Sequence, residues 1–319
     1  MLSRVFQLVK IARKLSTSGA VNTINQLYNL PLVVNIFFKI ISIGSETKAS
    51  NEDKQPGEKL CLALEGMGTT FIKLGQFLAT RPDIIGENLA KDLEKLQDKL
   101  PAFDTYEAKK IIQKEVGDNQ FKNIVELSEP IAAASIAQVH IAKIKYDSSE
   151  KEVAIKILRP DIEKLFNEEL DALMLFAYIV ENTISKAKRL KLVEVVYLLR
   201  EITNIEMDLR FEAAAANELY ENTINDKGFN VPKIYWNYTS KKILTLDKVN
   251  GVSIREHEKI RDYGINSEIL AKNLIQHFLK QAVRDGFFHG DMHQGNLFVD
   301  SKGNIIPVDF GIMGRLDKN

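Results

Sequence analysis

The chain has 319 residues, of which 45% are hydrophobic and 27% are charged, enough to build a core in one large domain or two lobes. Lys and Arg total 43 and Asp and Glu total 43, so no net charge draws the chain toward nucleic acid. The single cysteine, Cys61, excludes an intramolecular disulfide and fits a reducing compartment. We expect it to be a small buried side chain rather than a reactive thiol.

The N-terminal segment is basic and lacks acidic residues before Glu46. Its cations are Arg4, Lys10, Arg13, Lys14 and Lys39. This pattern fits either a mitochondrial transit peptide or an amphipathic helix that rests on anionic lipid. The apolar stretch from Pro31 to Ile43 is too short to span a bilayer and is interrupted by Lys39. The sequence therefore predicts no membrane-spanning segment.

Two helical regions follow a polar linker predicted at Ser45 to Gly57. Glu58 to Leu78 has a helical pattern. A second set of leucines keeps helical spacing, at Leu89, Leu93, Leu96 and Leu100.

From Pro130 onward the pattern alternates between strands and helices. A hairpin is predicted from two strands, Ile131 to Tyr146 and Glu152 to Leu158, joined at Asp147-Ser148-Ser149. The further elements expected are helices at Asp161 to Leu190, Leu192 to Tyr220 and Ile269 to Arg284, a strand at Ile243 to Val249, and a strand-turn-strand unit at Asn296 to Phe310. A small sheet that precedes a mostly helical part indicates an α+β, two-lobed plan.

The segment from His289 to Asn296, together with Asp309-Phe310-Gly311, carries the strongest chemical signal. Phosphoryl transfer needs a carboxylate near the attacking oxygen, and an Asn and an Asp that hold magnesium on the phosphates. Asp291, Asn296 and Asp309 have the order and nearly the spacing of the kinase arrangement. A zinc site made by His289, Asp291 and His293 is an alternative, but it leaves Asn296 and Asp309 unexplained.

A lysine on the second predicted strand matches the phosphate-binding lysine of kinases. It is Lys156, in Val153-Ala154-Ile155-Lys156. Such a lysine requires a buried glutamate from a helix. On the predicted helix from Leu192 to Tyr220, Glu206 lies on the apolar face with Leu199, Ile202 and Leu209, and a charge there is costly unless it is paired. The sequence therefore predicts an ion pair between Lys156 and Glu206.

The loop expected to cover the phosphates is rich in alanine where a protein kinase has glycines. Its residues are Ile131, Ala132, Ala133, Ala134, Ser135, Ile136, Ala137, Gln138 and Val139. Small side chains still allow backbone amides to approach phosphate, but alanine penalises the positive φ angles that glycine permits. We expect a stiffer loop and altered nucleotide handling. A small-residue start to a strand is the alternative interpretation.

These motifs together resemble the UbiB family of atypical kinases. Lys73-Leu74-Gly75-Gln76 matches the family's KxGQ signature. The alanine-rich loop, Glu206-Met207-Asp208, the segment from His289 to Asn296 and Asp309-Phe310-Gly311 recur in the family in this order. The resemblance covers nearly the whole chain, and the basic N-terminus resembles that of bacterial members.

The resemblance implies a protein-kinase-like fold with a helical KxGQ extension, ATP and Mg²⁺ as cofactors, and a role in ubiquinone biosynthesis. Family members act at the inner membrane of bacteria or mitochondria, as ATPases or small-molecule kinases. Partners would be quinone-biosynthesis enzymes or lipid quinone intermediates at a membrane surface, with no nucleic acid. The cytoplasmic face of a bacterial inner membrane is the expected location, and the mitochondrial inner membrane is the alternative.

The resemblance also implies a role for each matching residue. Asp291 would accept a proton or orient the nucleophile, Lys156 would bind the phosphates, and Asn296 and Asp309 would bind magnesium. Ile131 to Val139 would cover the nucleotide, and Asp247 to Asn250 would form the hinge that faces adenine. The last set would restrain the pocket, with Lys73 and Gln76 leaning toward Glu206 and Asp208.

The expected divisions are 1–57 (basic region and linker), 58–130 (KxGQ extension), 131–253 (N-lobe) and 254–319 (part of a C-lobe). Because family members continue beyond this point, we expect a fragment with an incomplete C-lobe. The apolar surface near Leu270 to Phe278 would then lack packing partners.

Two other function classes remain open. An aminoglycoside- or choline-kinase-like phosphotransferase also uses a His-Gly-Asp loop, although it lacks the KxGQ helices. A non-catalytic, lipid-binding pseudokinase is the third possibility. The complete set of predicted metal ligands argues against it, whereas the expected truncation argues for it.

Overall fold

The computed structural model describes residues 9–10, 12–13, 56–96, 100–183 and 185–317. Most of the predicted basic segment and most of the predicted linker lie outside the described residues. The described chain divides into two compact units. The first contains the residues up to Leu100 together with 134–136 and Asp161–Asn204, and the second contains 101–133, 137–160 and the residues from Ile205 onward. The boundaries at 57, 130 and 253 stay a prediction.

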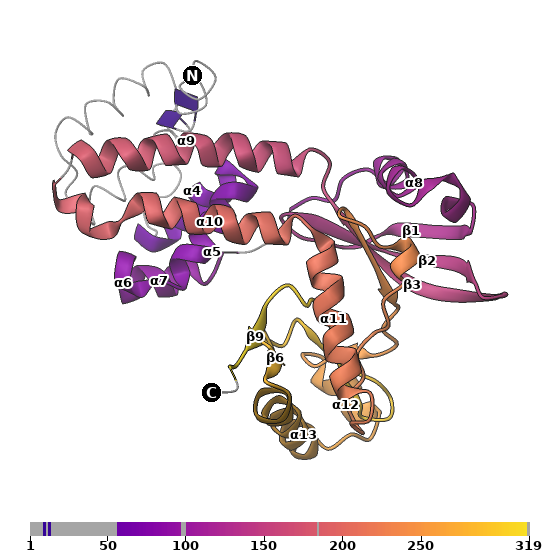
Figure 1. Ribbon diagram of the computed structural model, residues 1–319. Coiled ribbons are helices and arrows are strands. Elements are labelled where there is room, and N and C mark those ends of the chain that lie inside the picture. The colour runs from indigo at the N-terminus through magenta and orange to yellow at the C-terminus, as the bar shows by residue number, and fades with distance from the viewer. Residues whose placement is uncertain (1–8, 11, 14–55, 97–99, 184, 318–319) are drawn as a thin grey trace. The chain divides into compact units, whose positions relative to one another are not determined.

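The first unit is helical. Its elements are α4 (Pro56–Met67), α5 (Thr69–Ala79), α6 (Pro82–Ile85), α7 (Glu87–Leu93), α9 (Ile162–Thr183), the 3₁₀-helix η1 (Ser185–Leu190) and most of α10 (Leu192–Glu206). Helices α9 and α10 run side by side (Figure 1). An ion pair of 2.7 Å between Arg200 on α10 and Asp171 on α9 joins them. In the part of the chain that the structure describes, no helix is both long enough and apolar enough to cross a membrane.

The predicted helix from Glu58 to Leu78 forms, but as two helices that are separated at Gly68. Gly75, the glycine of the KxGQ signature, is buried on α5. A Cβ atom at this position would overlap Leu96 Cδ1 and lie 2.9 Å from Leu64 Cδ1. Glycine therefore allows α5 to approach its neighbours within the first unit.

The second unit begins with helix α8 (Thr105–Phe121), which was not predicted from the sequence, and a four-stranded antiparallel sheet. The strands, in spatial order, are β1 (Ile124–Ala133), β2 (Ala137–Tyr146), β3 (Ser149–Leu158) and β4 (Ile243–Asp247). Helix α8 packs on one face of the sheet, where Ala108 and Ile112 join Val153, Ile155 and Ile157 in the core. The left-handed turn at Asp147 and Ser148 closes the predicted hairpin between β2 and β3.

The predicted strand from Ile131 to Tyr146 is wrong as a single element. Strand β1 begins at Ile124 and ends at Ala133, and the chain leaves the sheet at residues 134–136 before β2 begins. Pro130 did not mark the start of a strand, because β1 lies at the sheet edge and its pairing with β2 shifts register on both sides of Pro130. A proline is tolerated at such an irregular edge position.

The predicted helix from Leu192 to Tyr220 is also two helices. Helix α10 ends at Glu206, and α11 spans Leu209–Thr223. Asp208 has an extended backbone, and its side chain accepts a hydrogen bond from Arg210 N, so it is the N-cap of α11. The break changes the helical phase between Glu206 and the residues that follow.

The rest of the second unit combines short helices with two small sheets. Its elements are the 3₁₀-helix η2 (Trp236–Tyr238), α12 (His257–Asp262), α13 (Ser267–Leu279), the π-helix η3 (Lys280–Asp285), β5 (Val252–Ser253), β6 (Phe287–His289), β7 (Leu297–Val299), β8 (Ile305–Pro307) and β9 (Met313–Arg315). Strands β5, β7 and β8 form one sheet, and β6 pairs with β9. The strand-turn-strand unit predicted at Asn296 to Phe310 is thereby confirmed as β7 and β8.

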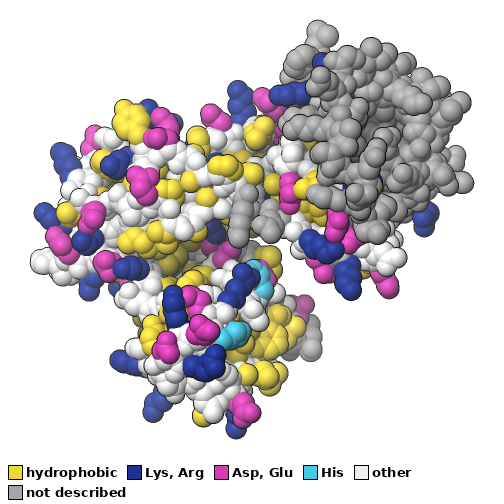
Figure 2. All heavy atoms as spheres, turned by 180° about the vertical axis from the view of Figure 1, so that it is seen from behind, with side chains coloured by type: hydrophobic (Ala, Val, Ile, Leu, Met, Phe, Trp, Pro, Cys, Tyr) yellow, Lys and Arg dark blue, Asp and Glu magenta, His cyan; other side chains and the backbone are white. Residues whose placement is uncertain are grey.

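Apolar side chains are exposed on α13, η3 and the segment around β9, and Figure 2 shows such side chains gathered on the C-terminal part of the second unit. They are Ile269, Ile275, Leu279, Val283, Ile312 and Leu316. On the other face of α13, Leu270 is buried, so only part of the predicted apolar surface lacks cover.

Candidate functional site

Lys156 forms a largely buried ion pair with Glu212 in the second unit. Strand β3 places it opposite Val139 on β2 and Leu244 on β4. Its Nζ donates to both carboxylate oxygens of Glu212, each at 2.9 Å. The Glu212 side chain is 8% exposed and that of Lys156 is 20% exposed, so water competes little for this pair.

The predicted partner, Glu206, was wrong: Lys156 pairs with Glu212. The prediction assumed that one helix carries both Leu199 and Leu209, but α10 ends at Glu206. On α11, Glu212 lies on the buried face with Leu209, Ala213 and further residues spaced three or four apart. This stripe behind the cap Asp208 is the sequence signal that could have identified Glu212.

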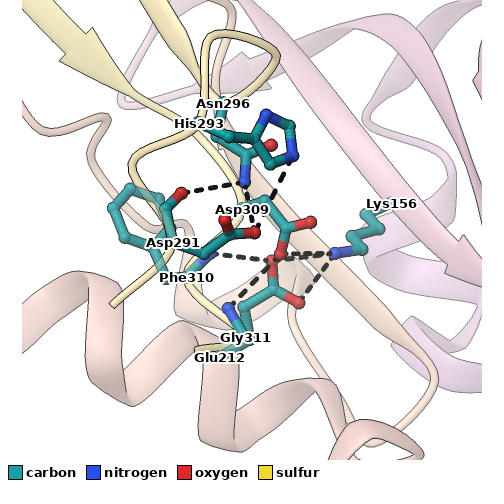
Figure 3. Close-up of polar contacts among 8 residues, drawn as sticks. All are labelled: Lys156, Glu212, Asp291, His293, Asn296, Asp309, Phe310 and Gly311. Atoms are coloured by element: carbon teal, nitrogen blue, oxygen red, sulfur yellow. Dashed lines mark hydrogen bonds and ion pairs between the residues drawn. The ribbon is translucent and has the colours of Figure 1, made fainter. Parts of the chain in front are cut away.

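Asp309 links the ion pair to the Asp-Phe-Gly segment. Its Oδ1 lies 3.5 Å from Lys156 Nζ and accepts a hydrogen bond from Gly311 N at 3.3 Å. The backbone N–H of Phe310 donates to Glu212 Oε1 at 3.4 Å. Asp309 has a φ of 63°, a left-handed conformation that aspartate tolerates better than most residues. Figure 3 shows these side chains converging with those of Asp291 and Asn296.

Asp291 and Asn296 are fixed to each other in the loop between β6 and β7. Asn296 Nδ2 donates to Asp291 Oδ2 at 3.0 Å and to the Asp291 carbonyl at 3.2 Å. His293 lies beside them, with Nε2 3.8 Å from Asp291 Oδ2. The predicted residues Asp291, Asn296, Asp309 and Lys156 thus gather in one unit of the fold.

His289 is a buried residue that contacts both the loop of Asp291 and the Asp-Phe-Gly segment. It is 1% exposed, and its Nδ1 accepts a hydrogen bond from Asp291 N at 3.2 Å. Its ring meets that of the buried Phe310 at a centroid distance of 5.8 Å. An acceptor role for Nδ1 requires the proton of the neutral ring to be on Nε2. Burial lowers the pKa of His289 and so favours this neutral form.

The charges of the ion pair respond to burial and to each other. Burial opposes the ammonium of Lys156, but Asp309 and Glu212 outweigh it and raise the pKa of Lys156. Burial also raises the pKa of Glu212, against the opposing attraction of Lys156. We take the pair as charged because the ammonium donates to both carboxylate oxygens.

The donor set fits magnesium bound together with nucleotide phosphates. Because Asn296 Nδ2 donates to Asp291, the amide is oriented so that Oδ1 can act as a ligand. The carboxylate of Asp309 is 53% exposed and can supply a second hard oxygen. Magnesium commonly takes one or two protein oxygens and completes its shell with phosphates and water.

The zinc alternative has no support in this geometry. Among the residues that the structure describes, no three His, Cys, Asp or Glu side chains form a group suited to a metal ion. His289 and His293 both use Nδ1 to accept backbone N–H groups, from Asp291 and Gly295 respectively.

The predicted alanine-rich loop is divided between strands and a turn. Ile131, Ala132 and Ala133 end β1, and Ala137, Gln138 and Val139 begin β2. The intervening turn, Ala134–Ile136, belongs to the first unit, where the Ser135 carbonyl accepts a hydrogen bond from Thr69 Oγ1 at 3.3 Å. The position of β2 beside β3 brings the end of this loop next to Lys156 in the sheet.

Gln138 acts as a clamp that the sequence did not predict. It is 1% exposed, and its amide bonds both backbone groups of Phe103, at 2.8 Å and 3.1 Å. Its Nε2 also lies 2.8 Å from His140 Nε2, and His140 Nδ1 reaches the Ser128 carbonyl at 2.8 Å. These contacts tie the start of β2 to β1 and to the segment that leads into α8.

The predicted pocket restraint stays a prediction. Lys73 and Gln76 lie on α5 in the first unit, whereas Glu206 and Asp208 belong to the second. Asp208 caps α11 and pairs with Arg210 at 2.6 Å. The hinge prediction is also untested, although Asp247 ends β4 and accepts a hydrogen bond from Tyr235 Oη at 2.7 Å.

A sheet that carries a lysine paired with a helical glutamate, followed by an Asp-Asn loop and an Asp-Phe-Gly segment, defines a protein-kinase-like fold of the α+β class. A solved structure supports this: that of Rv3197 with erythromycin, from Mycobacterium tuberculosis, has a TM-score of 0.57. It is 26% identical and is matched over 76% of this chain and 59% of its own.

Residues 95–319 match the family model of the ABC1 atypical kinase-like domain. Two curated relatives, each named "Probable protein kinase UbiB", are 37% identical. The one from Marinobacter nauticus matches over 92% of this chain and 54% of its own length, and the one from Azotobacter vinelandii over 81% and 48%. The chain thus belongs to the ABC1 atypical kinase-like family, and it spans about half the length of these relatives.

Proposed function

We propose that this protein binds ATP with Mg²⁺ in the second unit and transfers or hydrolyses the terminal phosphoryl group. The observation that carries the proposal is the Lys156–Glu212 ion pair, with both distances at 2.9 Å and Asp309 at 3.5 Å from the same ammonium. An ammonium held between two carboxylates is suited to contact phosphate oxygens, because binding exchanges one negative partner for another.

Each side chain has a distinct task in the proposed reaction. Lys156 binds the phosphates, and Glu212 fixes Lys156. Asn296 and Asp309 hold Mg²⁺, which neutralises charge on the phosphates when it is bound. Asp291 accepts a proton from the nucleophile or orients it, and the hydrogen bond from Asn296 Nδ2 fixes one of its oxygens. The alanine-rich loop, Ile131 to Val139, covers the nucleotide.

The family and the names of the relatives support an atypical kinase or ATPase that serves ubiquinone biosynthesis. In this proposal the partners are quinone-biosynthesis enzymes or lipid quinone intermediates at a membrane surface. Replacing the native gene and measuring quinone during growth on a respiratory carbon source tests the biological role. Normal quinone without a functional copy would remove that role.

The chemical proposal is tested by the turnover of ATP in the presence and absence of magnesium. Asp309→Asn removes one proposed metal ligand and should abolish magnesium-dependent turnover. Asp262→Asn on α12 is the matched control, because Asp262 is exposed and lies outside the site. Turnover that survives Asp309→Asn at the control level would contradict the proposal.

A small-molecule phosphotransferase is the second candidate, since the Rv3197 structure contains a bound erythromycin. Phosphorylation of an amino alcohol or an aminoglycoside, in the absence of any effect on quinone, would rank this candidate first. Nucleotide binding without any turnover would instead favour the non-catalytic alternative.

A further inference from the structure

A π-helix lies between α13 and β6, the strand that leads into the loop of Asp291. Helix α13 ends at Leu279, and the next six residues, Lys280–Asp285, continue as η3. Gly286 then takes a left-handed φ of 65°, and the chain enters β6. A π-helical turn alters which residues face the core, and such turns are frequent at functional sites.

The π-helix turns Gln281 toward the loop. Gln281 is 0% exposed, whereas Val283, two residues later, is 80% exposed. The Gln281 Oε1 atom accepts a hydrogen bond from the backbone N–H of His289 at 3.2 Å. His289 in turn accepts the backbone N–H of Asp291 through Nδ1, also at 3.2 Å. Two hydrogen bonds therefore connect Gln281 to Asp291 through His289.

The position of η3 is fixed from the other side by an arginine. Arg284 binds both oxygens of Asp226, at 2.9 Å and 3.0 Å, and the Asn222 carbonyl at 3.1 Å. Asn222 belongs to α11, the helix that also carries Glu212. Arg284 and Gln281 lie on the same π-helix. The contacts of Arg284 with Asp226 and Asn222 therefore help to keep Gln281 beside His289.

We infer that Gln281 is a positioning residue, which sets the orientation of Asp291 through the backbone and ring of His289. The inference rests on the proposed phosphoryl transfer. Gln281 has no hydrogen bond to Lys156, Glu212 or Asp309 among the described contacts, so it acts on the orientation of Asp291 and not on the binding of phosphates. Its loss should lower kcat and leave the KM for ATP nearly unchanged.

The test compares two conservative substitutions on adjacent turns. Gln281→Met keeps the size of the side chain and removes the acceptor. Gln276→Met makes the same change at an exposed position on α13. Hydrogen exchange at the amides of His289 and Asp291 is measured together with magnesium-dependent ATP turnover, alone and in an Asp291→Asn background.

We expect faster exchange at these two amides in Gln281→Met, a fall in kcat of about 10- to 100-fold, and no further fall in the Asp291→Asn background. Exchange at the wild-type rate, or kcat equal to that of Gln276→Met, overturns the inference. Exchange that rises evenly over the whole second unit also overturns it, because the role is then only structural. If the wild-type chain turns over no ATP, the proposed function fails, and the exchange measurement still decides whether Gln281 positions the loop.

Discussion

Replacement of Glu212 by Gln should lower the free energy of unfolding more than the same replacement at Glu206. The amide that replaces the carboxylate would keep one acceptor for Lys156 and Phe310 N, but the second oxygen and the charge would be lost. A hydrogen bond to a charged group contributes about 1.5–3 kcal/mol, so we expect Glu212→Gln to lower the free energy of unfolding by this amount. Asp309 offsets little of the loss, because it lies 3.5 Å from Lys156 Nζ and its side chain is 53% exposed.

A double-mutant cycle isolates the interaction from other effects of each substitution. Lys156→Met is combined with Glu212→Gln and, separately, with Glu206→Gln, and each free energy of unfolding is measured by urea denaturation. The coupling energy should be roughly 1–3 kcal/mol for Glu212 and within about 0.5 kcal/mol of zero for Glu206. Equal coupling at the two glutamates, or a larger value at Glu206, would refute the assignment of Glu212.

Three further predictions concern packing, the Gln138 clamp and pH. Gly75→Ala should lower the free energy of unfolding by about 1–3 kcal/mol, because its Cβ would overlap Leu96 Cδ1. Adding Leu96→Ala to this variant should recover part of the loss. Losses in the double variant that equal the sum of the two single losses would contradict this reasoning. Gln138→Leu should lower the free energy of unfolding by roughly 2–4 kcal/mol, because the backbone N–H and carbonyl of Phe103 both lose a partner. Gln113→Leu, at an exposed position on α8, is the control and should change the free energy of unfolding little. Burial lowers the pKa of His289, so its contribution to stability is present above the unfolded value of about 6.5 and is lost as the pH falls below it. The urea midpoint should therefore fall less between pH 7.5 and pH 5 in His289→Gln than in the wild type, and parallel curves would argue against this.

The sequence predicted which candidate site residues lie close together, because these residues occur in short, ordered motifs. Asp291, Asn296 and Asp309 belong to one loop and the hairpin after it, so their proximity follows from local chain geometry. Lys156 lies on a strand whose alternation is visible in Val153, Ile155 and Ile157, all buried. These parts of the site needed no knowledge of distant contacts.

The partner of Lys156 could not be found by counting apolar positions along one long helix. Two non-helical residues, Met207 and Asp208, separate α10 from α11 and change the helical phase. The hydrophobic pattern of the sequence nevertheless continues across this break. The capping role of Asp208 was the available signal, because a side chain that accepts Arg210 N ends one helix and begins another. The hydrogen bonds of Gln138 to Phe103, and the contact of Gln281 with His289, were missed for a different reason. Their partners are backbone groups, and such partners leave no mark in the sequence.

Helix α11 contacts several of these separate motifs within the second unit. The phase set by Asp208 directs Glu212 to Lys156 on the sheet and to the N–H of Phe310 after Asp309. At its other end, the Asn222 carbonyl binds Arg284, whose π-helix carries Gln281 to the loop of Asp291. A shift of α11 along its axis would therefore disturb the lysine, the Asp-Phe-Gly segment and the loop together. A substitution that only unseats the cap, such as Asp208→Ala, should on this reasoning weaken nucleotide binding and slow turnover in the same variant, although Asp208 itself bonds to none of the proposed ligand-binding side chains in the described contacts.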